Sequence, residues 1–318
     1  MIFAKWREVE PRFFVIDSQV TATKQSLTNE AFSEKWSAYS NEDEGERERF
    51  FEFQKDWFLR LYGFGDEAEL AAHLSNFEWI LDAGCGLGYK AAWFASLAPG
   101  STVIGIDYSS AAYIAYTKYA DAHKNLIFAK GDIAATNLPD GAIGLAACDQ
   151  VIMHTEDPAL TLQELSRITS DGGEVFCYWY RKKAVPRELL DDFFRSHTAK
   201  RSSEELWKLS KEVLSLGKML SELDIQADFP DVPSLGIVGG KMDLQRFIYW
   251  NFIKCFWNEE LGYATSLSTN FDWYSPVNAK RFSLDEVSAD VQAAGLTKTF
   301  FNEEESCFSG RFVKQGVV

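Results

Sequence analysis

The chain has 318 residues, of which 46% are hydrophobic and 15% aromatic, so it is long enough to bury one large core with a sizeable insertion. Its formal net charge is -15 and its longest basic run is residues 181–183, which disfavours a nucleic-acid partner and an anionic membrane surface. No apolar run approaches the roughly 20 residues that span a bilayer, and residues 1–14 lack the apolar segment of a signal peptide, so we expect a cytoplasmic protein.

The cysteines and histidines do not predict a metal site. The five cysteines are odd in number, and no two of them have the CxxC spacing of a zinc or redox site. The four histidines are scattered along the chain. We therefore expect buried free thiols, a reducing compartment and no bound metal.

The N-terminal part, residues 1–77, is predicted to be a helical segment, although its first residues show no clear pattern. Phe32, Trp36 and Tyr39 are spaced at i, i+4 and i+7, which places them on one face of a helix. A second helix is predicted over residues 66–77. We expect these three side chains either to form a lid that shuts a ligand site from water, with Trp36 at the ligand, or to belong to a plain packing helix.

Strands and helices then alternate from residue 78 to residue 180. Strands are predicted at 78–84, 101–109, 125–133, 142–150 and 174–180, with helices at 89–99, 110–123 and 158–169. Alternation at this pitch predicts an α/β fold with a parallel, doubly wound, Rossmann-like sheet.

The pattern breaks at residues 181–282, which contain amphipathic helical stretches and the aromatic run "RFIYWNFIKCFW". A helix at 283–296 follows, and two strands after it read as an antiparallel hairpin. We therefore predict a seven-stranded, mostly parallel sheet that ends in this hairpin. The expected boundaries are 1–77 for the N-terminal lid, 78–180 for the core, 181–282 for a helical cap insertion, and 283–318 for the end of the core sheet.

The stretch "LDAGCGLGYK", residues 81–90, follows the first core strand and contains three alternating glycines. Gly84 lets the strand turn, Gly86 lets the backbone approach a ligand, and Gly88 lets the next helix start close to the sheet. The dinucleotide pattern GxGxxG fails because position 89 is Tyr. Asp82, beside the loop, suits a cationic ligand such as S-adenosylmethionine (SAM), which carries an ammonium and a sulfonium.

These motifs resemble those of the class I SAM-dependent methyltransferases, motif by motif over residues 78–180 and more loosely over 283–314. "VIGIDYS" resembles their second motif, and Asp107 lies 23 residues after the first loop glycine. The resemblance implies that Asp107 accepts hydrogen bonds from the ribose hydroxyls. "KGDI" resembles their third motif, so that Asp132 would accept from the adenine amino group and Ile133 would pack on the ring.

The segment after the fourth strand, residues 148–173, resembles methyltransferases of the ubiquinone and menaquinone type. Many of these have two histidines where this chain has Met153 and His154, and an acid where it has Gly144. The expected cofactor is SAM, with S-adenosylhomocysteine as its product. The predicted cofactor contacts are Asp82, Gly84, Cys85, Gly86, Gly88, Asp107, Tyr108, Asp132, Ile133, Gln150 and Trp36.

Methyl transfer from a sulfonium needs alignment of the reacting atoms, and it needs a base only for some acceptors. His154 is our candidate base, because its pKa suits proton transfer near neutral pH; alternatively it packs on the cofactor or caps the next helix. Gln150 is expected to orient either the amino-acid part of SAM or the acceptor.

Acceptor contacts are predicted at two places. Tyr180 and Arg181 end the fifth strand, where Arg181 could clamp an anionic group or lie in solvent. Residues 270–282 read as a loop that Pro276 closes, and three of its side chains are further candidates. These candidates are Asp272, Trp273 and Tyr274.

The sequence thus predicts a SAM-dependent methyltransferase that acts on a small-molecule acceptor, in a biosynthetic pathway. One alternative is a SAM-fold enzyme with an outcome other than methylation. Another is a SAM-binding or scaffold protein without turnover. The aromatic insertion could equally form a contact in a homodimer.

Overall fold

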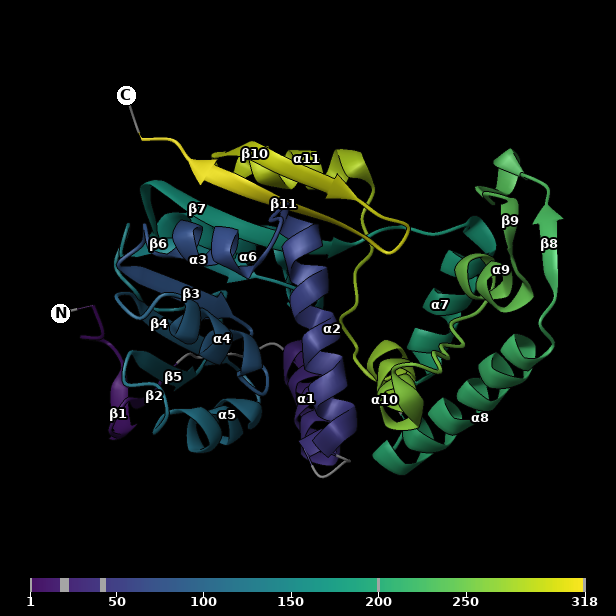
Figure 1. Cartoon of the computed structure of the whole chain (residues 1–318), viewed down its shortest axis with the longest axis horizontal. Helices are drawn as coiled ribbons and strands as arrows, with labels where there is room; N and C mark the ends of the chain where they lie inside the picture. Colours follow the sequence, from purple (N-terminus) through teal and green to yellow (C-terminus); the bar gives the residue numbers. More distant parts are fainter. Residues whose placement is uncertain (1, 18–22, 41–43, 199–200, 317–318) are drawn as a thin grey trace. The chain divides into compact units, whose positions relative to one another are not determined.

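The computed structural model describes residues 2–17, 23–40, 44–198 and 201–316 (Figure 1). It divides the chain into two compact units. Unit 1 comprises Met1–Asn29, Phe53–Arg181 and Lys280–Val318, and unit 2 comprises Glu30–Glu52 and Lys182–Ala279. The division passes through helices α1 (Thr23–Ser40) and α2 (Glu44–Tyr62), so unit 2 takes in part of the N-terminal segment together with most of the expected insertion.

Unit 1 is built on a nine-stranded sheet in the order β1-β2-β5-β4-β3-β6-β7-β11-β10. The strands are β1 Arg7–Glu10, β2 Phe13–Val15, β3 Trp79–Ala83, β4 Thr102–Asp107, β5 Leu126–Lys130, β6 Ile143–Cys148, β7 Thr169–Tyr180, β10 Leu296–Glu303 and β11 Cys307–Lys314. The pairs from β2 to β7 are parallel, and β11 is antiparallel to both β7 and β10. This arrangement confirms the doubly wound, mostly parallel sheet with a C-terminal antiparallel hairpin.

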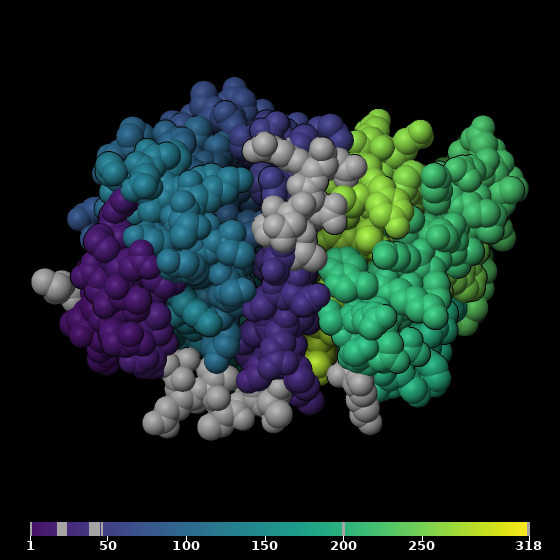
Figure 2. All heavy atoms as spheres, turned by 90° about the horizontal axis from the view of Figure 1, so that it is seen from below, coloured from purple at the N-terminus to yellow at the C-terminus, as the bar shows by residue number. Residues whose placement is uncertain are grey.

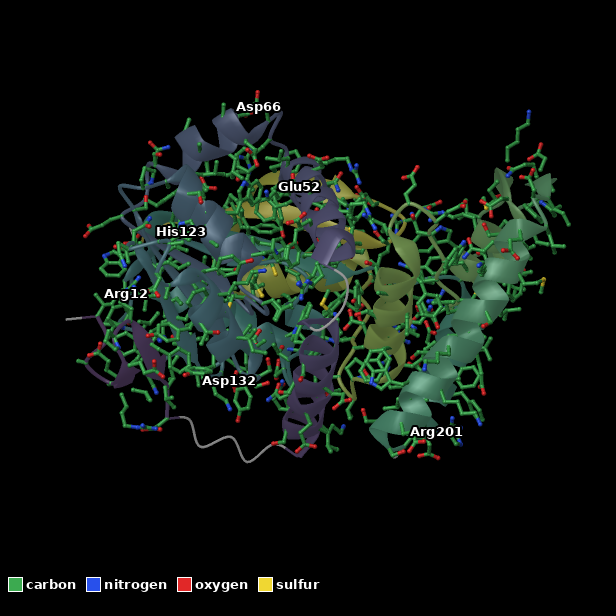
Figure 3. The ribbon with its side chains drawn as sticks, turned by 60° about the horizontal axis from the view of Figure 1, so that its bottom comes forward. Arg12, Glu52, Asp66, His123, Asp132 and Arg201 are labelled. Carbon is green, nitrogen blue, oxygen red and sulfur yellow. The ribbon has the colours of Figure 1, made fainter. Side chains whose placement is uncertain are left out.

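The hairpin β1–β2 is a difference from the sequence-based prediction of seven strands and a helical N-terminal segment. β2 pairs with β5, so the hairpin extends the sheet edge, and in the space-filling view it lies against the neighbouring part of the core (Figure 2). Phe13 is buried, and the Trp6 indole donates to the Thr136 carbonyl at 2.7 Å. Arg12, at the turn, has φ 68° and donates to the His123 carbonyl at 2.8 Å; both residues are labelled in Figure 3. These long-range contacts hold a hairpin that is too short to show a pattern of its own.

The helices of unit 1 lie on both faces of the sheet. Besides the parts of α1 and α2 that belong to this unit, they are α3 Glu67–Leu74, α4 Tyr89–Leu97, α5 Ala111–Tyr119, α6 Pro158–Ile168 and α11 Leu284–Ala293. The crossovers through α4 and α5 move along the sheet toward β5, whereas the crossover through α6 moves toward β7. Because such crossovers are right-handed, α6 lies on the face opposite α4 and α5. Because β3, β4, β5 and β6 are parallel, their carboxyl ends lie along the same edge of the sheet.

Unit 2 is mainly helical. It contains α7 Val185–Thr198, α8 Ser203–Glu222, α9 Leu244–Asn251 and α10 Gly262–Tyr274, with a two-stranded ribbon of β8 Gln226–Phe229 and β9 Gly240–Asp243 (Figure 1). Trp207 of α8 stacks on Phe271 of α10 with ring centroids 3.9 Å apart. Gly217 lets α8 pass close to the segment after α9, since a Cβ there would lie 2.2 Å from the Cys255 carbonyl oxygen.

The prediction that residues 270–282 form a loop is wrong for its first five residues, which end helix α10. Phe271, Trp273 and Tyr274 are buried there, and the Asn270 amide donates to the Ser266 carbonyl one turn earlier. The burial of three aromatic rings outweighs a local composition that favours a turn.

All five cysteines are buried and free, as predicted. Within the described ranges, no helix combines the length and the apolar character that crossing a membrane requires.

Candidate functional site

The glycine loop connects β3 to α4 at the carboxyl edge of the sheet. The amide groups of Gly84 and Cys85 both donate to the Ile106 carbonyl of β4, at 2.7 and 2.9 Å, which ties the loop to the neighbouring strand. Gly84 has φ 83°, and a Cβ there would lie 2.4 Å from the Val151 side chain. Gly88 has φ 77°, and its Cβ would lie 2.6 Å from α5. Both positions therefore require glycine.

Two carboxylates stand at the ends of the next strands. Asp107 ends β4, and its oxygens accept from the Gly86 amide at 2.8 Å and from the amide and hydroxyl of Ser109 at 2.8 and 2.6 Å. Asp132 follows β5 and accepts from the Ala134 amide at 2.9 Å (Figure 3). Burial raises the pKa of Asp132. The structure thus brings the predicted Asp107 and Asp132 together with the glycine loop.

Tyr108 and Ile133 stand next to these two carboxylates in the chain. Tyr108 is partly exposed and burial raises its pKa, whereas Ile133 is 5% exposed and belongs to the core. Cys85, inside the loop, is also buried, and burial raises the pKa of its thiol. A buried neutral thiol at this place acts as a packing group.

Behind the loop lies a buried charge cluster that the sequence analysis did not predict. Lys90 of α4 forms an ion pair with Asp149, which directly follows β6, and the Tyr62 hydroxyl donates to the other Asp149 oxygen at 2.9 Å. Burial alone would lower the pKa of Lys90, but the negative groups around it, first of all Asp149, together raise that pKa. A lysine in the otherwise apolar helix "YKAAWFASL" is the signal that could have indicated this cluster.

Asp82 belongs to the same cluster. Its side chain is buried in β3, and its Oδ2 atom has no hydrogen-bond partner among the described residues. Burial raises the pKa of Asp82 to about 6, and the nearby charge of Lys90 opposes that rise. One lysine thus faces the carboxylates of Asp82 and Asp149, and the cluster carries excess negative charge when both are ionised.

Gln150 connects this cluster to helix α2. The residue has φ 64°, and its amide donates to the Gln54 side chain at 2.7 Å and to Asp149 at 3.3 Å. The Tyr89 hydroxyl reaches the same Gln54 oxygen at 3.3 Å. Gln54 therefore holds two side chains at the mouth of the glycine loop, and sequence reasoning gave no sign of this role.

His154 ends a short 3-10 turn, η1 (Ile152–His154), beyond the Gln150 loop. It is 5% exposed, and its ring meets the Tyr180 ring edge-on with centroids 5.5 Å apart. The Gln25 amide donates to the His154 carbonyl at 3.4 Å. Tyr180 ends β7, so the candidate base and one candidate acceptor contact are neighbours in unit 1.

Arg181 also lies in unit 1. Its guanidinium lies 3.8 Å from a carboxylate oxygen of Glu303 and 5.2 Å from the centroid of the Phe308 ring. It donates to the Glu304 carbonyl at 3.4 Å as well. These contacts place the arginine charge beside the hairpin β10–β11.

The other candidates belong to unit 2. Trp36 lies in α1 with the Lys35 ammonium 4.1 Å from its ring centroid, and Lys35 pairs with Asp272 at 3.0 Å. The side chain of Tyr39 lies outside the described residues. Trp273 donates from its indole at 2.9 Å and Tyr274 from its hydroxyl at 2.8 Å, both to partners inside unit 2.

Residues 81–177 match the family model of a methyltransferase domain. The chain contains a class I SAM-dependent methyltransferase domain. A protein of Schizosaccharomyces pombe described as an uncharacterized methyltransferase is 35% identical over 106 residues, which cover 31% of this chain and 38% of that protein. The demethylmenaquinone methyltransferase of Lactococcus lactis is 28% identical over 163 residues, which cover 47% of this chain and 65% of the enzyme.

A SAM-dependent methyltransferase from Mesorhizobium loti is similar in structure, with 14% identity and a TM-score of 0.46 over 78% of this chain and 98% of that one. The chain spans between about a third and two thirds of the lengths of the curated relatives named above. The matched residues 81–177 lie within unit 1.

Proposed function

We propose that the chain binds SAM at the glycine loop and transfers its methyl group to a small-molecule acceptor. The observation that carries the proposal is the row of acceptor-only carboxylates along three adjacent strands. Asp82 lies in β3, Asp107 ends β4 and Asp132 follows β5. A cofactor with an ammonium, two ribose hydroxyls and an adenine amino group supplies one donor group for each carboxylate.

The unpartnered Oδ2 atom of Asp82 supports the fit of such a cofactor. A buried carboxylate oxygen without a donor is costly, and a cationic donor would relieve that cost. Gly86 leaves the backbone bare beside Asp107, which suits close approach of a ribose. We propose five further cofactor contacts, namely Cys85, Tyr108, Ile133, Gln150 and Trp36.

SAM supplies a methyl group on a positively charged sulfur, so the protein needs mainly to align the acceptor and to exclude water. We propose His154 as the base that takes the acceptor's proton when the acceptor is a hydroxyl or an acidic carbon. Its burial beside the Tyr180 ring would hold the imidazole in one orientation. Arg181 is proposed to contact an anionic part of the acceptor.

We propose that unit 2 supplies acceptor specificity, since insertions in α/β enzymes commonly carry binding residues. Asp272, Trp273 and Tyr274 stay candidates for this role. The polar atoms of Trp273 and Tyr274 already bond inside the unit, so their contribution would come from position and ring surface. The names of two relatives, a ubiquinone biosynthesis O-methyltransferase and a demethylmenaquinone methyltransferase, support a small-molecule acceptor in a biosynthetic reaction.

Calorimetric titration with SAM, S-adenosylhomocysteine and NADH tests the proposal. We expect binding of the first two and none of NADH. Release of S-adenosylhomocysteine on addition of a metabolite extract then tests turnover. NADH binding without SAM binding would overturn the proposal, whereas SAM binding without turnover on any extract would favour a binding protein.

A further inference from the structure

Unit 2 buries a lysine that has no carboxylate partner. Lys254 follows α9 and is 8% exposed. Its ammonium donates to the Tyr249 hydroxyl at 2.7 Å, and within the described part of the chain no carboxylate forms an ion pair with it. An ammonium has three N–H donors, so two of them lack an acceptor.

Aromatic rings surround this ammonium. The ring centroids of Tyr249, Trp273 and Phe256 lie 4.9, 5.0 and 5.5 Å from Lys254 Nζ. Cation–π contacts of this kind hold the charge in place. They do not neutralise it, and they provide no acceptor for the remaining N–H groups.

Asp191, a buried carboxylate that shares the neighbour Trp273 with Lys254, is engaged elsewhere. One Asp191 oxygen pairs with Arg187 at 2.8 Å, and the other accepts from the Trp273 indole at 2.9 Å. Arg187 is 1% exposed, and Arg195 adds a further cation 5.8 Å from the Trp273 ring. Asp191 therefore balances Arg187 and leaves the charge of Lys254 uncompensated, which is unfavourable in a buried position.

Two more donors belong to Tyr249 and to its ring neighbour Trp250. The Tyr249 hydroxyl accepts from Lys254, so its own proton is available, and no acceptor for it exists among the described residues. The Trp250 indole nitrogen is buried without a partner, and its ring lies 4.7 Å from that of Tyr249. Donors that outnumber acceptors beside an excess positive charge are the features of an anion-binding site.

We propose that Lys254 and the Tyr249 hydroxyl bind an oxyanion, namely a carboxylate or phosphate group of a ligand. One oxygen of such a group bridges the two donors, and the negative charge balances the ammonium. If the chain has the proposed function, on which this step rests, the oxyanion is the anionic part of the methyl acceptor. The acceptor class is then a carboxylated or phosphorylated small molecule.

Fluorine NMR on the full chain tests the site with two probes, trifluoroacetate and monofluorophosphate. A chloride salt keeps the ionic strength the same in every sample. Binding broadens the probe signal. We expect Lys254→Met to raise the probe's dissociation constant about tenfold or more, and Tyr249→Phe to raise it by a smaller factor. Lys241→Met, at an exposed lysine of β9 in the same unit, is the matched control and should bind as the wild type does.

Broadening of trifluoroacetate alone assigns a carboxylate, and preference for monofluorophosphate assigns a phosphate. No broadening with either probe, or equal broadening in wild type and in both Lys254→Met and Tyr249→Phe, overturns the site. SAM affinity is measured on the same samples. A wild-type protein that does not bind SAM would refute the proposed function but not the anion site. The failure of one proposal is therefore distinguishable from the failure of the other.

Discussion

Units 1 and 2 each bury a small cluster of charged side chains, and the two clusters have opposite excess charge. In unit 1, Lys90 faces the carboxylates of Asp82 and Asp149. In unit 2, Asp191 balances Arg187 and leaves a second buried cation, Lys254. A buried charge is costly unless it is paired. Each excess charge therefore indicates a ligand group of the opposite sign, which is a cation in unit 1 and an anion in unit 2.

We expect the largest effect from a substitution at His154, which should change kcat, whereas a substitution at Lys254 should change KM for the acceptor. His154→Ala should lower kcat by roughly 10²–10⁴-fold, because the loss of a general base has this magnitude. Lys254→Met should instead raise KM for the acceptor and leave SAM affinity unchanged. Steady-state kinetics on an acceptor that supports release of S-adenosylhomocysteine measures both.

His154→Gln keeps a hydrogen-bonding group but cannot take a proton at neutral pH. A Gln variant with the wild-type rate would reduce His154 to a positioning residue. Loss of SAM affinity in both His154 variants would instead place it among the cofactor contacts. A kcat effect in Lys254→Met as large as that in His154→Ala would break the division of roles between the units.

The charge cluster of unit 1 should be the more fragile in folding. Lys90→Met leaves two buried carboxylates without their cation, so we expect the free energy of unfolding to fall by about 3–5 kcal/mol. Lys124→Met, at an exposed position, should change it by less than about 0.5 kcal/mol. Urea denaturation followed by circular dichroism measures both values.

A partner substitution tests whether charge is the cause. In Lys90→Met/Asp149→Asn, one uncompensated charge is removed, and part of the lost stability should return. Equal stability of Lys90→Met and wild type would show that the cluster is not held together by this ion pair. A double variant no better than the single one would point to lost packing of the lysine stem instead.

Asp107→Ala should weaken SAM binding by about 1–3 kcal/mol, the range for losing hydrogen bonds to a charged group. The same change removes the acceptor of the Gly86 amide, so the loop itself is affected. Asp107→Asn keeps the side-chain shape and separates the two causes. Asp121→Ala, at an exposed acid just beyond α5, is the control in calorimetric titrations.

The sequence predicted the central sheet and the positions of Gly84, Asp107 and Asp132, because strand–helix alternation and motif spacing are local properties. It did not predict the hairpin β1–β2, whose strands have four and three residues and depend on pairing with β5. Nor did it predict that Tyr62 and Lys90 meet at Asp149. These residues come from three separate parts of the chain, and only the fold brings them together.

The error at residues 270–274 has a related cause. Asn270 and Asp272 favour turns when read locally, and a proline follows soon after. In the structure, the rings of Phe271 and Trp273 are buried in unit 2, and the long-range pair between Asp272 and Lys35 adds to the helix. Tertiary burial decided the conformation, and a single sequence does not show which partners provide it.

The smallest expected effect is the pH dependence of SAM binding through Asp82. Its pKa is raised to about 6, so the carboxyl is protonated below that pH and ionised above it. A bound ammonium favours the ionised form, because it supplies the opposite charge. SAM affinity should therefore be constant above about pH 7 and fall as the pH drops below 6, by at most about tenfold per pH unit. Asp82→Asn should be weaker at pH 7 and flat throughout.

Calorimetry in two buffers of different ionisation enthalpy provides the independent check. Binding near pH 6 shifts Asp82 toward the ionised form, so a fraction of a proton should be released to the buffer per SAM bound. The Asp82→Asn variant should release none by this route. Wild-type affinity that stays constant from pH 5 to 8, with no proton release, would mean that the ammonium of SAM does not pair with Asp82. The buried carboxylates of unit 1 would then serve only to balance Lys90, which pairs with Asp149. The opposite excess charge of units 1 and 2 would no longer indicate two ligand groups of opposite sign.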